Sequence, residues 1–214
     1  MMQNQENNFG SRGESTVDLE TMRQQFDNAP YPAIPLETSP RDDLDALYIH
    51  TLVTPFYLRN QQILETRGKV LLDAGCGTGY TSLLLAEANP GARIVGIDLS
   101  EKSVELAANR LHHYGFEDVE FHAMSIEDLP QLGLEFDFIN CDETLYLLPD
   151  PLAGLQAMKA VLKPEGIIRT NLHSSLQRDF CYRAQRVFTL MGLMEGAIED
   201  LQVELTRQFM MALK

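Results

Sequence analysis

The sequence has few basic residues, few cysteines and no long apolar run. Lysine and arginine number 17 against 31 aspartates and glutamates, which gives a formal net charge of −14. Such a surface repels phosphate backbones, so a nucleic-acid partner is not expected. The cysteines, Cys76, Cys141 and Cys181, are widely spaced and show no C-x-x-C or metal-type pattern. Neither disulfides nor structural zinc are therefore indicated.

Membrane and export signals are also missing. No apolar run approaches the roughly 20 residues that span a bilayer. Residues 1–18 contain no apolar stretch of the kind that a secretory signal needs. A soluble cytoplasmic protein without a membrane partner is the default expectation. A length of 214 residues with a hydrophobic fraction of 44% suits one α/β domain with an appendage.

The sequence pattern divides the chain into four segments. Residues 1–17 are polar and rich in Asn, Gln, Ser and Gly, which predicts a disordered tail. Residues 18–65 contain a short helix, a proline-rich arm at 29–40, and helical spacing that Pro55 interrupts before a further helix at 56–64. Residues 66–175 alternate strands with helices, and residues 176–214 return to helical spacing.

The segment 66–175 predicts an α/β fold that is Rossmann-like and doubly wound. The expected elements are strands at 69–73, 92–98, 119–123, 136–141 and 166–172, and helices at 80–88, 100–113 and 152–163. Strands that alternate with helices favour a mainly parallel sheet with right-handed crossovers and helices on both faces. Pro164 is expected to end the helix that precedes the last strand.

The stretch VLLDAGCGTG, residues 70–79, carries the strongest functional signal. A glycine-rich turn from a strand into a helix lets a ligand approach the backbone and the positive helix N-terminus. A dinucleotide fingerprint reads G-x-G-x-x-G, whereas the third glycine here comes one residue early. Asp73 would repel a pyrophosphate but attract a ligand with an ammonium group. S-adenosylmethionine has an ammonium group and a sulfonium, and it has no phosphate.

This stretch resembles the first motif of class I S-adenosylmethionine-dependent methyltransferases, and the resemblance continues through residues 69–172. The stretch FDFINCDETLYLLPDP, residues 136–151, is similar to the small-molecule, quinone-biosynthesis type. The resemblance implies that Asp98 accepts hydrogen bonds from both ribose hydroxyls and that Leu99 packs on adenine. The whole set of cofactor-binding residues that it implies is Asp73, Gly75, Cys76, Gly77, Asp98, Leu99, Ser125, Ile126 and Cys141.

The same resemblance implies methyl transfer to a small-molecule acceptor by direct in-line displacement, with S-adenosylhomocysteine as the product. Asp142 and Glu143, directly after the fourth strand, are candidates to orient or deprotonate the acceptor, although capping of the next helix explains them equally well. His173, just past the fifth strand, is a further candidate base, for which helix capping or simple exposure is the alternative. Some quinone-type members bind a metal through Glu and His where this chain has Tyr146 and Leu147, so no metal is expected.

The ends of the chain raise alternatives. Residues 18–65 are expected to form a lid over the site, as N-terminal segments often do in this family. Members usually add two strands after the fifth, and none is indicated after Ser175. We therefore expect a truncated or atypical version whose exposed strand edge is covered by the terminal helices or by a second copy in a homodimer. A methyltransferase for protein side chains and a non-catalytic S-adenosylmethionine-binding module are the other functional hypotheses.

Overall fold

The computed structural model describes residues 19–193 and 200–212. The predicted disordered tail at 1–17 lies outside the described residues. The chain forms two compact units, which divide between Asn171 and Leu172.

The first unit contains these elements in chain order: α1 (Leu19–Asn28), α2 (Leu44–His50), α3 (Val53–Asn60), β1 (Val70–Ala74), α4 (Tyr80–Ala88), β2 (Arg93–Asp98), α5 (Glu101–His113), β3 (Val119–Ala123), the 3-10 helix η1 (Ile126–Leu132), β4 (Phe136–Cys141), the 3-10 helix η2 (Leu145–Leu147), α6 (Pro151–Ala160) and β5 (Leu162–Thr170). The second unit contains α7 (Asp179–Leu190) and α8 (Asp200–Ala212).

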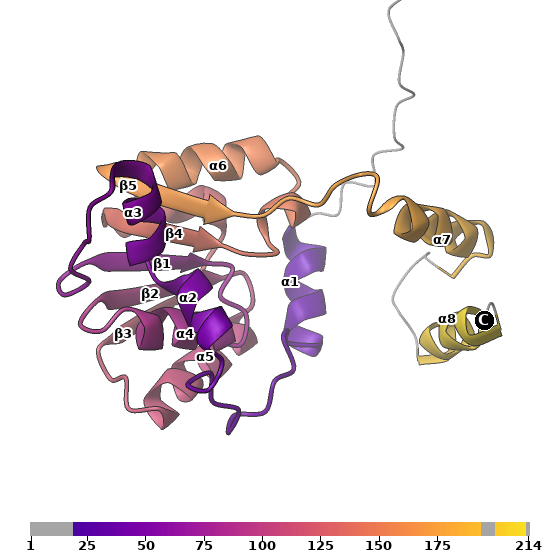
Figure 1. The fold of residues 1–214 in the computed structure, drawn as a ribbon. Coiled ribbons are helices and arrows are strands. Elements are labelled where there is room, and N and C mark those ends of the chain that lie inside the picture. Colours follow the sequence, from indigo (N-terminus) through magenta and orange to yellow (C-terminus); the bar gives the residue numbers. More distant parts are fainter. Residues whose placement is uncertain (1–18, 194–199, 213–214) are drawn as a thin grey trace, which may run out of the picture. The chain divides into compact units, whose positions relative to one another are not determined.

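The strands form one parallel sheet in the order β3-β2-β1-β4-β5 (Figure 1). The winding direction changes between β1 and β4, so the connections after these two strands diverge and leave a crevice at the carboxyl edge of the sheet. Helix α6 and both 3-10 helices cover one face, while α3, α4 and α5 pack on the other. The predicted Rossmann-like, doubly wound α/β fold is thus confirmed.

The central strands are nearly continuous apolar runs, as parallel strands with helices on both faces require. Alternate residues of β1 serve opposite cores: Leu72 packs towards α6 and η1, and Leu71 packs towards α4 and α5. Both side chains are fully buried. The sheet is therefore a rigid base for the loops at its carboxyl edge.

Strand β5 begins earlier than the sequence pattern indicates. Leu162 pairs with Phe136 and Ile167 pairs with Phe138, so residues 163–166 form a bulge. Pro164 is tolerated there because a bulged residue makes no regular ladder hydrogen bond. The prediction that Pro164 ends a helix is therefore wrong, since α6 already ends at Ala160.

The break between α2 and α3 also lies elsewhere than predicted. It falls at Thr51 and Leu52, and Pro55 stands in the first turn of α3, where its missing N–H would have no helical partner. Helix α3 ends at Asn60 rather than at 64, because Gln61 adopts a left-handed conformation with φ of 60°. The helical character of this segment was predictable, but its boundaries were not.

In the second unit, the rings of Phe188 in α7 and Phe209 in α8 pack edge to face with centroids 5.8 Å apart. No strand follows β5 in the part of the chain that the structure describes, and β5 is the last strand on its side of the sheet. A homodimer that covers this edge stays a prediction. No helix within the described ranges is long and apolar enough to cross a bilayer.

Candidate active site

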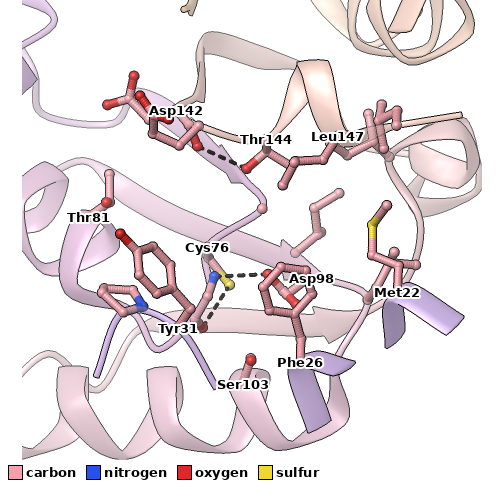
Figure 2. Close-up of a pocket in the computed structure, with 18 of the residues that line it drawn as sticks. Met22, Phe26, Tyr31, Cys76, Thr81, Asp98, Ser103, Asp142, Thr144 and Leu147 are labelled. Carbon is pink, nitrogen blue, oxygen red and sulfur yellow. Dashed lines mark hydrogen bonds between the residues drawn. The ribbon is translucent and has the colours of Figure 1, made fainter. Parts of the chain in front are cut away.

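A cavity of about 310 Å³ lies at the carboxyl edge of the sheet in the first unit (Figure 2). The structure brings together many of the predicted site residues in its wall: Gly75, Cys76, Gly77, Asp98, Leu99, Ile126, Asp142 and Glu143. The predicted residues that do not line it are Asp73, Ser125, Cys141 and His173. The wall also includes residues of the N-terminal segment, among them Met22, Phe26 and Tyr31.

The loop from β1 to α4 requires glycine at three of its positions. Gly75, Gly77 and Gly79 all have positive φ angles, of 85°, 50° and 81°. A Cβ atom at Gly75 would lie 2.3 Å from Oγ1 of Thr144, and one at Gly77 would lie 2.2 Å from the carbonyl oxygen of Tyr31. These contacts bring the loop close to both the β4 connection and the N-terminal arm, so the loop forms the floor between them.

Asp98 ends β2 and faces the cavity from the side of the glycine loop (Figure 2). Its carboxylate accepts hydrogen bonds from the backbone N–H of Gly77 and of Ser100, both at 2.9 Å. Burial raises the pKa of Asp98 above its ordinary value, and these two donors offset part of that rise. Each carboxylate oxygen has a further lone pair, so Asp98 retains the capacity to bind two hydroxyl groups. The neighbouring wall residues Leu99 and Ile126 are apolar and suit an aromatic base.

Asp73 lies beneath the glycine loop and is only 2% exposed. Its Oδ2 accepts from the Ser82 hydroxyl at 2.6 Å, and its Oδ1 accepts from the Asn140 amide at 3.0 Å. Burial raises its pKa to about 6, although both hydrogen bonds lower it. The carboxylate is ionised at neutral pH. It does not line the cavity, but its negative charge lies close enough to interact electrostatically with a ligand bound there.

Ser125 and Cys141 are also buried behind the wall. Ser125 caps η1, where its hydroxyl accepts from the backbone N–H of Glu127 and contacts the Glu127 carboxylate. Burial raises the pKa of the Cys141 thiol to about 12, which makes it a poor nucleophile. His173 belongs to the second unit, where its Nε2 contacts the Arg178 guanidinium at 2.5 Å.

Asp142 and Glu143 line the cavity where the chain leaves β4. Burial raises the pKa of Asp142, but a hydrogen bond from His50 and the charge of Arg169 outweigh that effect and hold it below its ordinary value. Glu143 has a left-handed backbone with φ of 53°, which side chains rarely adopt. The Tyr146 hydroxyl donates to its carboxylate at 2.6 Å. Within the described ranges, no group of three or more His, Cys, Asp or Glu is placed to hold a metal ion.

The proline-rich arm is tied to the glycine loop by a buried arginine. The guanidinium of Arg110, in α5, donates to the carbonyls of Thr78, Ile34 and Pro35 at 3.0, 2.6 and 3.0 Å. Thr78 in turn donates from its backbone N–H to Tyr31 O at 3.1 Å. The sequence did not predict this role of Arg110, because its partners are backbone carbonyls, which every residue has and which therefore give no sequence pattern.

Sequence reasoning also missed His50, which ends α2 and lines the cavity. A buried amide positions it: Nδ2 of Asn89 donates to the His50 carbonyl at 3.0 Å, and Oδ1 accepts from the N–H of Leu52 at 2.8 Å. Nothing near His50 in the sequence indicates chemistry. The nearest signal would have been an isolated polar residue at the end of an otherwise apolar-faced helix.

Comparison with known proteins agrees with this geometry. Residues 65–209 match a family described as a methyltransferase domain. An uncharacterized protein from Synechococcus sp. is 33% identical over 178 residues, which cover 82% of this chain and 42% of that protein. The ubiquinone biosynthesis O-methyltransferase of Bordetella avium is 42% identical over 105 residues, which cover 47% of this chain and 41% of the relative. The chain thus spans less than half the length of these curated relatives.

Solved structures show the same likeness. The [4+2]-cyclase SpnF is 25% identical with a TM-score of 0.53, over 71% of this chain and 59% of that one. PKMT2 from Rickettsia typhi, in complex with AdoHcy, is 26% identical with a TM-score of 0.53, over 59% of this chain and 25% of that one. The family match, the relatives and the sheet order together confirm the resemblance: the chain belongs to the class I S-adenosylmethionine-dependent methyltransferases.

Proposed function

We propose that this chain is an enzyme that transfers a methyl group from S-adenosylmethionine to a small-molecule acceptor. The observation that carries the proposal is the cavity at the change of winding direction, where the glycine loop, the Asp98 carboxylate and an apolar wall meet. Ligands of open α/β sheets bind at this place. When bound, the cofactor supplies a methyl group that its sulfonium has already activated.

The residues present fit this cofactor. Asp98 would accept from the ribose hydroxyls through its remaining lone pairs, and Leu99 and Ile126 would flank the adenine. Gly75 and Gly77 line the cavity, and their lack of a side chain lets the loop pack against Thr144 and Tyr31, so the methionine part would lie beside the backbone of this loop. The buried charge of Asp73 favours an ammonium group, and it would oppose a pyrophosphate.

Two features support a small acceptor over a protein side chain. Several relatives are named ubiquinone biosynthesis O-methyltransferases, and ubiquinone is a small molecule. Met22, Phe26 and Tyr31 of the N-terminal segment form part of the cavity wall, which favours an enclosed acceptor over an open groove for a protein. We infer that residues 18–65 act as a lid, which excludes water and aligns the acceptor for in-line displacement.

Calorimetry and a transfer assay test the proposal. We expect S-adenosylhomocysteine to bind and a pyridine dinucleotide not to bind. Asp98→Asn should weaken binding about tenfold or more, since hydrogen bonds to a charged acceptor are lost. Asp118→Asn, at an exposed site, is the matched control. Transfer of the label from S-adenosylmethionine to a small molecule in a metabolite extract is the expected activity. Binding without turnover of any acceptor would instead indicate a non-catalytic module.

A further inference from the structure

Ser103 has a buried hydroxyl without a partner in the wall of the cavity. The residue lies in the first turn of α5 and is 1% exposed. Its Oγ makes no hydrogen bond with any residue that the structure describes. A serine inside a helix can donate to a carbonyl of the preceding turn, and Ser103 does not. Burying a hydroxyl without a partner costs free energy, so a function for this group is to be sought.

The neighbouring serine, Ser100, shows the contrast. Its hydroxyl donates to the Asp27 carboxylate of α1 at 2.7 Å and accepts from the backbone N–H of Ser103 at 2.9 Å. Its own backbone N–H donates to Oδ1 of Asp98 at 2.9 Å. Ser100 therefore uses its polar groups within the protein, and it fixes the first turn of α5 relative to the Asp98 carboxylate.

The hydroxyl of Ser103 points to the cavity. Figure 2 shows its oxygen on the side of α5 that faces Asp98 and Phe26. All three residues line the cavity. The side chain of Phe26 offers no oxygen or nitrogen, so it leaves the Ser103 hydroxyl without a partner. A polar group that enters the cavity can therefore supply the missing hydrogen bond.

A ribose has the complementary chemistry. The Asp98 carboxylate only accepts hydrogen bonds, so it uses the hydrogens of the ribose hydroxyls. The oxygen of each hydroxyl keeps lone pairs that can accept from a further donor, and donation to a carboxylate makes it a better acceptor. The Ser103 hydroxyl is a donor in the same wall. Asp98 and Ser103 thus offer the acceptor and the donor that a sugar diol requires.

We propose that Ser103 is a further cofactor-binding residue, whose hydroxyl donates a hydrogen bond to a ribose hydroxyl oxygen of S-adenosylmethionine. Ser103 is not among the residues that the resemblance implies for the cofactor. The proposal rests on the proposed function, because it places the cofactor in this cavity. The bound ribose supplies the partner that the hydroxyl lacks, so part of the cost of burying it is recovered on binding.

The test is Ser103→Ala, which removes only the hydroxyl oxygen. Calorimetry with S-adenosylhomocysteine should show a dissociation constant that is raised about three- to tenfold. Without ligand, the variant should unfold at the same or a higher urea concentration than the unchanged protein, because no hydroxyl remains buried without a partner. Weaker binding with undiminished stability is a result that a purely structural serine would not give.

Ser82→Ala is the matched control for stability. Ser82 is also a fully buried serine in a helix, but its hydroxyl donates to Oδ2 of Asp73 at 2.6 Å. Its replacement removes a donor from a buried carboxylate, so we expect Ser82→Ala to lower the midpoint of urea unfolding. If Ser103→Ala lowers the midpoint to the same extent, its hydroxyl has a structural role and the proposal is overturned.

Analogues of S-adenosylhomocysteine that contain 2′-deoxyribose or 3′-deoxyribose locate the contact. Each analogue lacks one hydroxyl oxygen that could accept from Ser103. With one of them, Ser103→Ala and the unchanged protein should bind about equally, because the accepting oxygen is missing. If Ser103→Ala weakens the binding of all three ligands to the same extent, its contact lies away from the ribose, and the proposal is overturned.

The role of Ser103 and methyl transfer can fail separately. Unchanged affinity of Ser103→Ala for S-adenosylhomocysteine would overturn the role of Ser103 and leave the proposed function intact. Binding by the unchanged protein without transfer to any acceptor would overturn methyl transfer, and calorimetry would still decide the role of Ser103. If the unchanged protein does not bind S-adenosylhomocysteine, both proposals fail.

Discussion

Asp73 and Asp142 lie at the carboxyl ends of adjacent strands, β1 and β4, yet their electrostatics are opposite. Burial raises the pKa of both carboxyl groups. The partners of Asp73 are two neutral groups, and its pKa stays raised, at about 6. The partners of Asp142 include a guanidinium and an imidazole, and its pKa falls below the ordinary value. The charge of the partners therefore decides the direction of the shift.

The difference extends to the two sides of the cavity. The loop side is held by close contacts at glycines and by hydrogen bonds that uncharged donors make to the Asp73 carboxylate. The side after β4 is held by charged groups from α2 and β5, whose interactions depend on protonation.

The largest expected effect comes from disturbing the close packing of the loop side. A Cβ at Gly79 would lie 2.6 Å from the Cα of Ala107, and φ at Gly79 is 81°. Gly115 has a similar φ of 84° but no atom within 4 Å of an added Cβ, so it is a matched control. We expect Gly79→Ala to lower the free energy of unfolding by about 2–4 kcal/mol and Gly115→Ala by about 1 kcal/mol. Urea denaturation measures both, and equal losses would contradict the packing argument.

A smaller effect should appear in the pH dependence of stability. The pKa of Asp73 is raised from its ordinary value of 3.8 to about 6, so its contribution is complete below 3.8 and is lost as the pH rises through about 6. The free energy of unfolding should fall by up to about 3 kcal/mol across this window. Asp73→Asn should remove this fall, as measured by denaturation at a series of pH values. Parallel pH curves for the two proteins would show that the burial of Asp73 has no energetic effect.

The smallest effect should come from Asp142, and its pH dependence should have the opposite sign. Its pKa is lowered, so its contribution is present above the ordinary value of 3.8 and is lost as the pH falls through the folded-state pKa. Asp142→Asn should lower the free energy of unfolding by at most about 1 kcal/mol, because the pair with Arg169 is partly exposed. Glu105→Gln, which breaks the exposed pair with Lys102, is the control. A loss that grows towards acid pH would contradict the assignment.

Much of the fold was predictable because its signals are local. Buried parallel strands read as apolar runs, and β3 and β4 have the predicted bounds. The start of β5 was not predictable, because pairing with Phe136 draws Leu162 into the sheet despite the proline two residues later. The residues of the candidate site were likewise predictable only where their signal is local. Gly75, Gly77 and Asp98 follow from one motif, whereas His50 and Arg110 act through contacts distant in the chain.

The sequence by itself determined the family, the parallel sheet and the glycine loop, since each depends on residues close together in the chain. Only the tertiary structure decided which acids face the cavity, which are buried behind it, and which histidine joins them. The physical reason is that burial and charge pairing depend on neighbours from several elements. Asp73 and Asp142 are the same residue type at the carboxyl ends of adjacent strands, and their surroundings alone give them different properties.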